Sequence, residues 1–145
     1  MPRIAYTRIA PAGLRALQTL DDYVRDSGLE PSLLELVKLR ASQINGCAYC
    51  VDLHAKQARA AGETEQRLYA MSVWREAPFF SERERAALAW TEATTMISED
   101  GVEEELFESV RKHFSEKELV DLSLAVAAIN AWNRIAIAFR PPIGV

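Results

Sequence analysis

Apolar residues recur every three or four positions along most of this chain, the spacing of one face of an α-helix. Residues 1–10 have no clear period and are expected to form an arm. Beyond them, glycine and proline residues separate the periodic stretches, and none alternates as a strand does. The predicted helices cover residues 11–28, 32–44, 46–61, 64–74, 81–97, 102–113 and 115–139. The pattern therefore predicts an all-α fold of six or seven helices in a single domain over residues 1–145.

Capping signals support several of these helix ends. Ser81-Glu82-Arg83-Glu84 and Ser115-Glu116-Lys117-Glu118 are capping boxes, in which serine and glutamate side chains satisfy free amides of the first turn. The Asn45-Gly46 pair interrupts the helical period, so we expect one helix to end there and Asn45 or Gly46 to cap the next. Asp100-Gly101 is predicted to be a turn, and Pro141-Pro142 ends the last helix.

The last and longest helix is apolar on more than one face. A helix of this kind must be buried on most sides, and in a chain of 145 residues we expect a neighbouring subunit to supply part of that burial. The alternative is the central helix of a monomer. Asp121, Asn130, Asn133 and Arg134 interrupt its apolar run, which argues against a membrane span.

The bulk composition is that of an ordinary soluble domain, with a formal net charge of −4. This acidic balance argues against a nucleic-acid partner. The N-terminus lacks the apolar run of a signal peptide, so we expect a cytoplasmic protein. In that compartment, two nearby cysteines are more often catalytic or metal-binding than a structural link.

The segment from Gly46 to His54 contains both cysteines and one of the two histidines. On a helix, Cys47, Cys50 and His54 fall on one face, and the positive end of the helix dipole favours a thiolate in the first turn. His54 can accept the thiol proton. Glu35, on the preceding helix, can fold back to orient His54, whereas Asp52 points away from this face.

Four interpretations of this group remain open from the residues alone. The first is a redox dithiol, in which one thiolate attacks and the second resolves. The second is a metal site with Cys47, Cys50, His54 and Glu35 as ligands. The third is a structural disulfide, which in so short a loop stabilises little. The fourth is a pair of cysteines that serve only as small apolar residues.

The spacing Glu35, Cys47, Cys50, His54 resembles the signature of alkylhydroperoxidase D-like proteins in the carboxymuconolactone decarboxylase superfamily. Ile44-Asn45-Gly46-Cys47, Trp74-Arg75-Glu76, the stretch 84–93 and Asn130-Ala131-Trp132-Asn133-Arg134 are also similar to that family. The resemblance covers about residues 33–139.

The resemblance implies a helical protein that assembles as trimers or hexamers and reduces hydroperoxides without a bound cofactor or metal. By position, Cys50 would be the peroxidatic cysteine and Cys47 the resolving one. His54 would be the base and Glu35 would complete the proton relay. An electron donor with thiols, which the sequence does not name, would restore the dithiol. Lactone decarboxylation is disfavoured, because the superfamily's decarboxylases lack this cysteine pair.

One departure from the family's pattern qualifies the expectation of a peroxidase. Tyr49 stands where the best-known peroxidase of the family has a second relay histidine, so the relay is expected to be shorter or the substrate different. Tyr49, Phe79 and Phe80 either line a pocket over the cysteines or pack in the core. The alternative function is a redox- or metal-responsive binding protein, or a general disulfide reductase, that uses the same cysteines.

Overall fold

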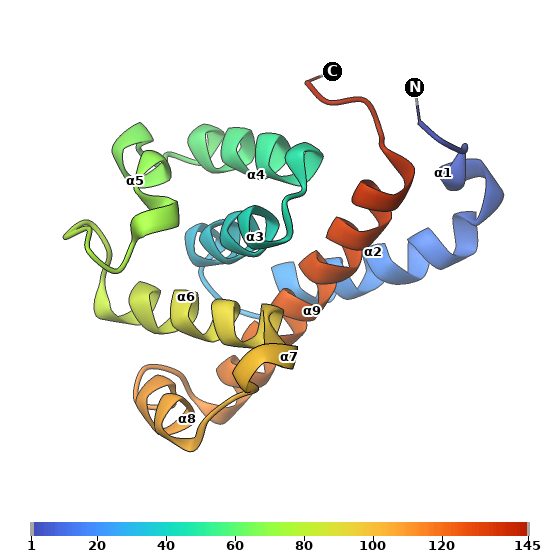
Figure 1. Cartoon of the computed structure of the whole chain (residues 1–145). Helices are drawn as coiled ribbons and strands as arrows, with labels where there is room; N and C mark the ends of the chain where they lie inside the picture. Colours follow the sequence, from blue (N-terminus) through green and yellow to red (C-terminus); the bar gives the residue numbers. More distant parts are fainter. Residues whose placement is uncertain (1, 145) are drawn as a thin grey trace.

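The computed structural model describes residues 2–144, and within this range it contains helices and no strand (Figure 1). The all-α prediction is therefore confirmed. The elements are α1 (Tyr6–Ile9), α2 (Pro11–Arg25), α3 (Pro31–Asn45), α4 (Ala48–Ala60), α5 (Glu65–Tyr69), the 3₁₀ turn η1 (Met71–Val73), α6 (Glu82–Thr95), α7 (Ile97–Asp100), α8 (Glu104–Val110) and α9 (Glu116–Phe139).

The predicted helices correspond to the longer elements, and the differences lie in short turns. The arm predicted over residues 1–10 instead contains the single turn α1, and the Arg3 amide donates to the Phe139 carbonyl at 2.8 Å. The predicted helix 64–74 divides into α5 and η1. Asp100, predicted to lie in a turn with Gly101, is instead the last residue of another short helix, α7, and Gly101 caps that helix. Such turns are too short to carry a helical period, which is why the pattern did not predict them.

Helix α3 forms the centre of the molecule and packs against α4, α6 and α9 (Figure 1). Its sequence accounts for this position, because apolar residues occur on several of its faces and most of them are buried. One cluster joins α2, α3, α6 and α9 and includes Val24, Val37, Trp90 and Leu122. A second cluster lies between α3, η1 and α6. It consists of Leu36, Leu39, Met71, Trp74, Phe80 and Leu88.

Helix α6 carries a buried carboxylate, Glu92, that ties three elements together. Its oxygens accept hydrogen bonds from Arg40 Nε at 2.9 Å, from Trp74 Nε1 at 3.0 Å and from Arg75. Burial opposes ionisation, but these bonds outweigh it and hold the pKa of Glu92 below its ordinary value.

Both predicted capping boxes, at Ser81 and Ser115, are present.

Helix α9 packs against α2, α3, α4 and α6. By length and hydropathy alone it is the one helix within residues 2–144 that could cross a membrane. Asp121, Asn130 and Asn133 on this helix are nonetheless buried and hydrogen-bonded to other helices of the chain. Helix α9 is therefore a core helix whose buried polar side chains bond to neighbouring helices.

Candidate active site

The tight turn between α3 and α4 holds the cysteine pair. Gly46 ends α3 in the left-handed conformation, with φ 71°, and the Cys47 amide donates to the Ser42 carbonyl at 3.0 Å. Cys47 then caps α4, and its sulfur accepts the Cys50 amide at 3.3 Å. The prediction that Asn45 or Gly46 caps this helix is wrong, because both residues complete α3. Cys47 and Cys50 form a disulfide, with their Cα atoms 5.3 Å apart.

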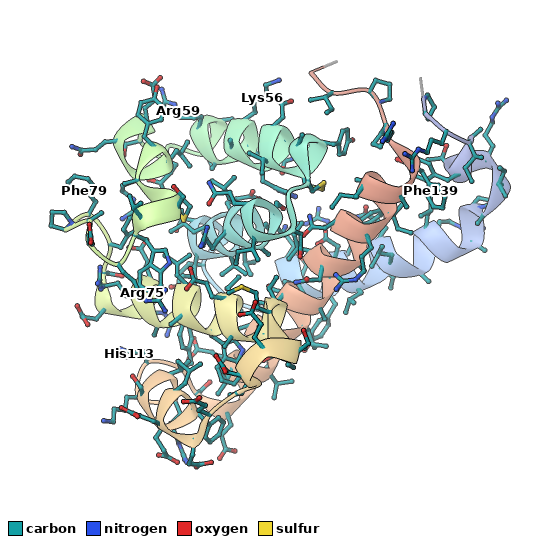
Figure 2. The ribbon with its side chains drawn as sticks, viewed as in Figure 1. Lys56, Arg59, Arg75, Phe79, His113 and Phe139 are labelled. Atoms are coloured by element: carbon teal, nitrogen blue, oxygen red, sulfur yellow. A yellow bond between two sulfur atoms is a disulfide. The ribbon has the colours of Figure 1, made fainter. Side chains whose placement is uncertain are left out.

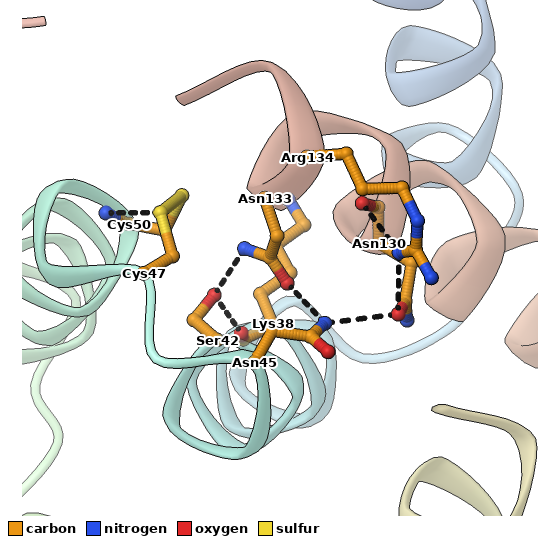
Figure 3. Close-up of a disulfide and its surroundings, with 8 residues drawn as sticks. All are labelled: Lys38, Ser42, Asn45, Cys47, Cys50, Asn130, Asn133 and Arg134. Carbon is orange, nitrogen blue, oxygen red and sulfur yellow. Dashed lines mark hydrogen bonds between the residues drawn. A yellow bond between two sulfur atoms is a disulfide. The ribbon is translucent and has the colours of Figure 1, made fainter. Parts of the chain in front are cut away.

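A buried polar network fixes the end of α3 just before this turn (Figure 3). The Asn45 amide group donates to the side-chain oxygens of Asn130 and Asn133, both at 2.9 Å, and Asn133 donates to Ser42 Oγ at 3.0 Å. These are all three asparagines of the chain. Asn130 and Asn133 are buried, and the half-buried Asn45 bonds to both, so the three amides define a single register between α3 and α9.

The side chains of His54 and Glu35 meet beside the disulfide. His54 Nδ1 lies 3.2 Å from Glu35 Oε2, and the two side chains are 11% and 18% exposed. The carboxylate fixes the orientation of the ring, which leaves Nε2 free for other partners. Asp52 instead pairs with Lys56 at 2.9 Å, away from this contact. The structure therefore pairs His54 with Glu35, as the sequence pattern predicted, and joins Cys47 to Cys50.

A cavity of about 910 Å³ lies over this group and is bounded by α1, α2, α3, α4 and α9. Its apolar lining consists mainly of Leu14, Leu34, Leu53, Ile129, Trp132 and Ile135. Glu35 and His54 also line it. Of the two cysteines, both within the described part of the chain, Cys50 lines the cavity and Cys47 does not. A ligand in this cavity can therefore reach the Cys50 side of the disulfide.

Aromatic residues divide between this cavity and the core. Tyr49 lines the cavity and packs against the disulfide, and Tyr6 lies nearby on α1. Burial, with a smaller contribution from Tyr49, raises the pKa of Tyr6, so this phenol keeps its proton at neutral pH. Phe79 and Phe80 belong to the separate cluster around Met71 and Trp74, and Figure 2 places Phe79 at the far end of the molecule from α9. For these two residues, the core alternative is therefore correct.

Four charged residues that the sequence pattern did not select also line the cavity: Arg15, Asp21 and Arg25 of α2 and Lys38 of α3. Lys38 is 9% exposed, which is unusual for lysine. The only signal in the sequence was its position three residues after Glu35, on the same helical face.

Within residues 2–144, no three His, Cys, Asp or Glu side chains are grouped as a metal site.

Comparison with known proteins points to one family. The sequence profile of the carboxymuconolactone decarboxylase family matches residues 11–93. The uncharacterized protein YdfG of Bacillus subtilis (strain 168) is 44% identical over 136 residues, which cover 94% of this chain and 92% of that protein.

Two solved structures show the same fold. A protein of unknown function from Agrobacterium tumefaciens, whose description suggests an antioxidant defence role as AhpD, superposes with a TM-score of 0.96 at 48% identity. The match covers 100% of this chain and 99% of that one. The debrominase Bmp8 superposes with a TM-score of 0.85 at 21% identity, covering 96% of this chain and 75% of that one. The second likeness concerns the fold alone.

Proposed function

Because the chain belongs to the carboxymuconolactone decarboxylase family and has an alkylhydroperoxidase D-like fold, we propose that it is a thiol-dependent peroxidase that reduces organic hydroperoxides. The observation that carries this proposal is the Cys47–Cys50 disulfide, with Cys50 facing a largely apolar cavity beside the His54–Glu35 pair. A cavity of this size and lining suits a small organic molecule.

The proposed catalytic cycle has three steps. The Cys50 thiolate attacks the terminal oxygen of the hydroperoxide, the O–O bond breaks, and the alkoxide takes a proton to leave as an alcohol. Cys50 is then a sulfenic acid. The Cys47 thiol attacks its sulfur, which forms the disulfide and releases water. A dithiol donor finally reduces this disulfide and is itself oxidised to a disulfide.

The positions of the two cysteines support this order of attack. Cys50 lines the cavity and stands in the first turn of α4, where the free amides of the helix favour a thiolate. Both cysteines are buried, but Cys47 stands at the helix cap and does not line the cavity. It therefore suits the resolving role, because it needs to reach only Cys50.

His54 and Glu35 support proton transfer at Cys50. In the reduced protein, His54 takes the proton of the Cys50 thiol and returns it to the departing alkoxide. Glu35 holds the imidazole ring through Nδ1 and balances the positive charge that forms on it. The same helix turn that positions Cys50 also positions His54, because residues four apart share a face.

The test is consumption of cumene hydroperoxide with dithiothreitol as the donor. We expect sustained turnover by the wild-type protein and loss of at least 100-fold in Cys50→Ser, because the attacking atom is gone. Asp52→Asn, on the outer side of the same helix, is the matched control and should keep wild-type activity. Full activity in Cys50→Ser would show that the assignment is wrong.

The second candidate function is a general disulfide reductase, which the same buried disulfide also supports. In that case the reduced protein transfers its electrons to a small organic disulfide and not to a hydroperoxide. Rapid reduction of such a disulfide, together with no loss of thiols on adding hydroperoxide, would favour this alternative over the peroxidase.

A further inference from the structure

The side chain of Lys38 lies between two carboxylates that belong to different helices. Its Nζ atom is 3.8 Å from Asp21 Oδ1 on α2 and 3.9 Å from Glu35 Oε1 on α3. The lysine side chain is 11% exposed, and those of Asp21 and Glu35 are 21% and 18% exposed. Charges this far from bulk water are weakly screened, so each should affect the other two.

Glu35 connects this pair to the histidine. Its Oε1 atom faces Lys38, whereas its Oε2 atom contacts His54 Nδ1 at 3.2 Å. Asp21, Lys38, Glu35 and His54 therefore form a line of alternating negative and positive groups whenever His54 is protonated. The carboxylates of Asp21 and Glu35 and the ammonium of Lys38 together carry a net charge of one negative unit. The positive charge of protonated His54 neutralises it.

Other charged groups around this line are few and lie nearer the surface. From α2, Arg15 and Arg25 line the same cavity, and Arg25 pairs with Asp22. The cavity residues of α9 are Ile129, Trp132, Ile135 and Ala136, which carry no charge, and α1 and α4 add the phenols of Tyr6 and Tyr49. Arg15 and Arg25 are exposed, so the four-group line holds the charges of this cavity that are least screened by water.

We infer that Asp21 and Lys38 are positioning residues that set the proton affinity of His54 through Glu35. Asp21 and Glu35 share the Lys38 ammonium almost equally, at 3.8 and 3.9 Å, so the ammonium does not pair with Glu35 alone. Glu35 thereby stays available to the imidazolium. The importance of this arrangement for catalysis rests on the proposed function, in which His54 is the base, but the electrostatic coupling itself does not.

The two residues should act in opposite directions. Asp21→Asn releases Lys38 to pair with Glu35, so His54 should bind its proton less tightly. Lys38→Met removes the competing cation, so His54 should bind its proton more tightly. An opposite charge within about 4–6 Å typically shifts a titration by 1–3 units. Through one intervening group, we expect about one pH unit downward for Asp21→Asn and about one unit upward for Lys38→Met.

The experiment is an NMR titration of the imidazole protons in the disulfide form of the full chain. The chain has two histidines, and His113 lies at the far side of α6 (Figure 2), so its signal is an internal control. Lys56→Met is the matched variant, since Lys56 is on the same helix as His54 but pairs with Asp52 at the surface. It should leave the His54 midpoint unchanged.

Opposite shifts of the His54 midpoint in the two variants, with His113 unmoved, would support the inference. Equal midpoints in the wild type and both variants, or shifts in the same direction, would overturn it. If Lys38→Met does not fold, Asp21→Asn decides alone: a downward shift supports the coupling, and no shift or an upward one refutes it. The titration needs no hydroperoxide, so it can succeed even where the peroxidase proposal fails.

Discussion

His54 contacts Glu35 through its Nδ1 atom and lines the same cavity as Cys50. Replacing it by glutamine keeps a side chain of similar polarity but removes the base. We predict that His54→Gln lowers kcat/KM for cumene hydroperoxide by about 100-fold, because positioned proton transfer contributes about 10²–10⁴-fold.

Circular dichroism separates this chemical effect from a structural one, because His54→Gln should keep the helix content of the wild-type protein. His113→Gln is the control on the second histidine and should keep the wild-type rate. A His54→Gln protein with the wild-type rate would remove His54 from the mechanism.

At the scale of elements, the asparagine network determines where α4 begins relative to α9. Asn133 is fully buried and bonded to both Ser42 and Asn45. We predict that Asn133→Ala lowers the free energy of unfolding by about 2 kcal/mol, because it leaves buried polar groups without partners. Urea denaturation measures this loss. Gln66→Ala, which removes an exposed amide on α5, should change it by less than about 0.5 kcal/mol.

Glu92 links α6 to α3 and to Trp74, and its contribution should depend on pH. The pKa of Glu92 in the folded protein lies below its ordinary value. The ionised carboxylate therefore stabilises the fold when the pH is above that ordinary pKa, and this stabilisation is lost as the pH falls through the pKa of the folded protein. Glu92→Gln should therefore cost about 2 kcal/mol near pH 7. The difference from wild type should narrow below about pH 4.

Thermal unfolding of Glu92→Gln across pH 3–7 measures this narrowing. Glu82→Gln, in the exposed first turn of the same helix, is the control and should show little difference at any pH. A deficit in Glu92→Gln that stayed constant from pH 7 to pH 3 would contradict the assigned role of the carboxylate.

At the scale of the whole molecule, the two ends of the described chain lie side by side (Figure 1), and apolar residues near both ends are exposed. Ile4, Ile9 and Ile137 are 43%, 66% and 44% exposed. We predict that this region contacts other copies of the chain and that the protein is a trimer or hexamer, since burial of exposed apolar groups favours association.

Light scattering after size exclusion tests this prediction. The molar mass should be three or six times 16.2 kDa, and Ile137→Asp should reduce it by placing a charge in the contact. A wild-type protein that stays at 16.2 kDa at micromolar concentrations would contradict the prediction.

The sequence was sufficient for the helical class and for much of the site, because both depend on local spacing. Helical periodicity predicted α2, α3, α4, α6, α8 and α9, and it predicted α5 as part of a longer helix. The gaps between Cys47, Cys50 and His54 placed the reactive groups within two turns. The capping role of Cys47 was not predictable, since it depends on Gly46 completing α3. Lys38 was missed because its contact with Asp21 joins two helices, and no local pattern encodes such a pairing.

The central claim is that Cys50 and Cys47 carry out a dithiol–disulfide cycle driven by hydroperoxide. The most direct measurement is a thiol titration of fully reduced protein before and after one equivalent of cumene hydroperoxide. We predict that both thiols are lost together and return with dithiothreitol, and that Cys47→Ser stops at a sulfenic acid on Cys50 that dimedone traps. Two thiols that remain titratable after the hydroperoxide is added would contradict the account.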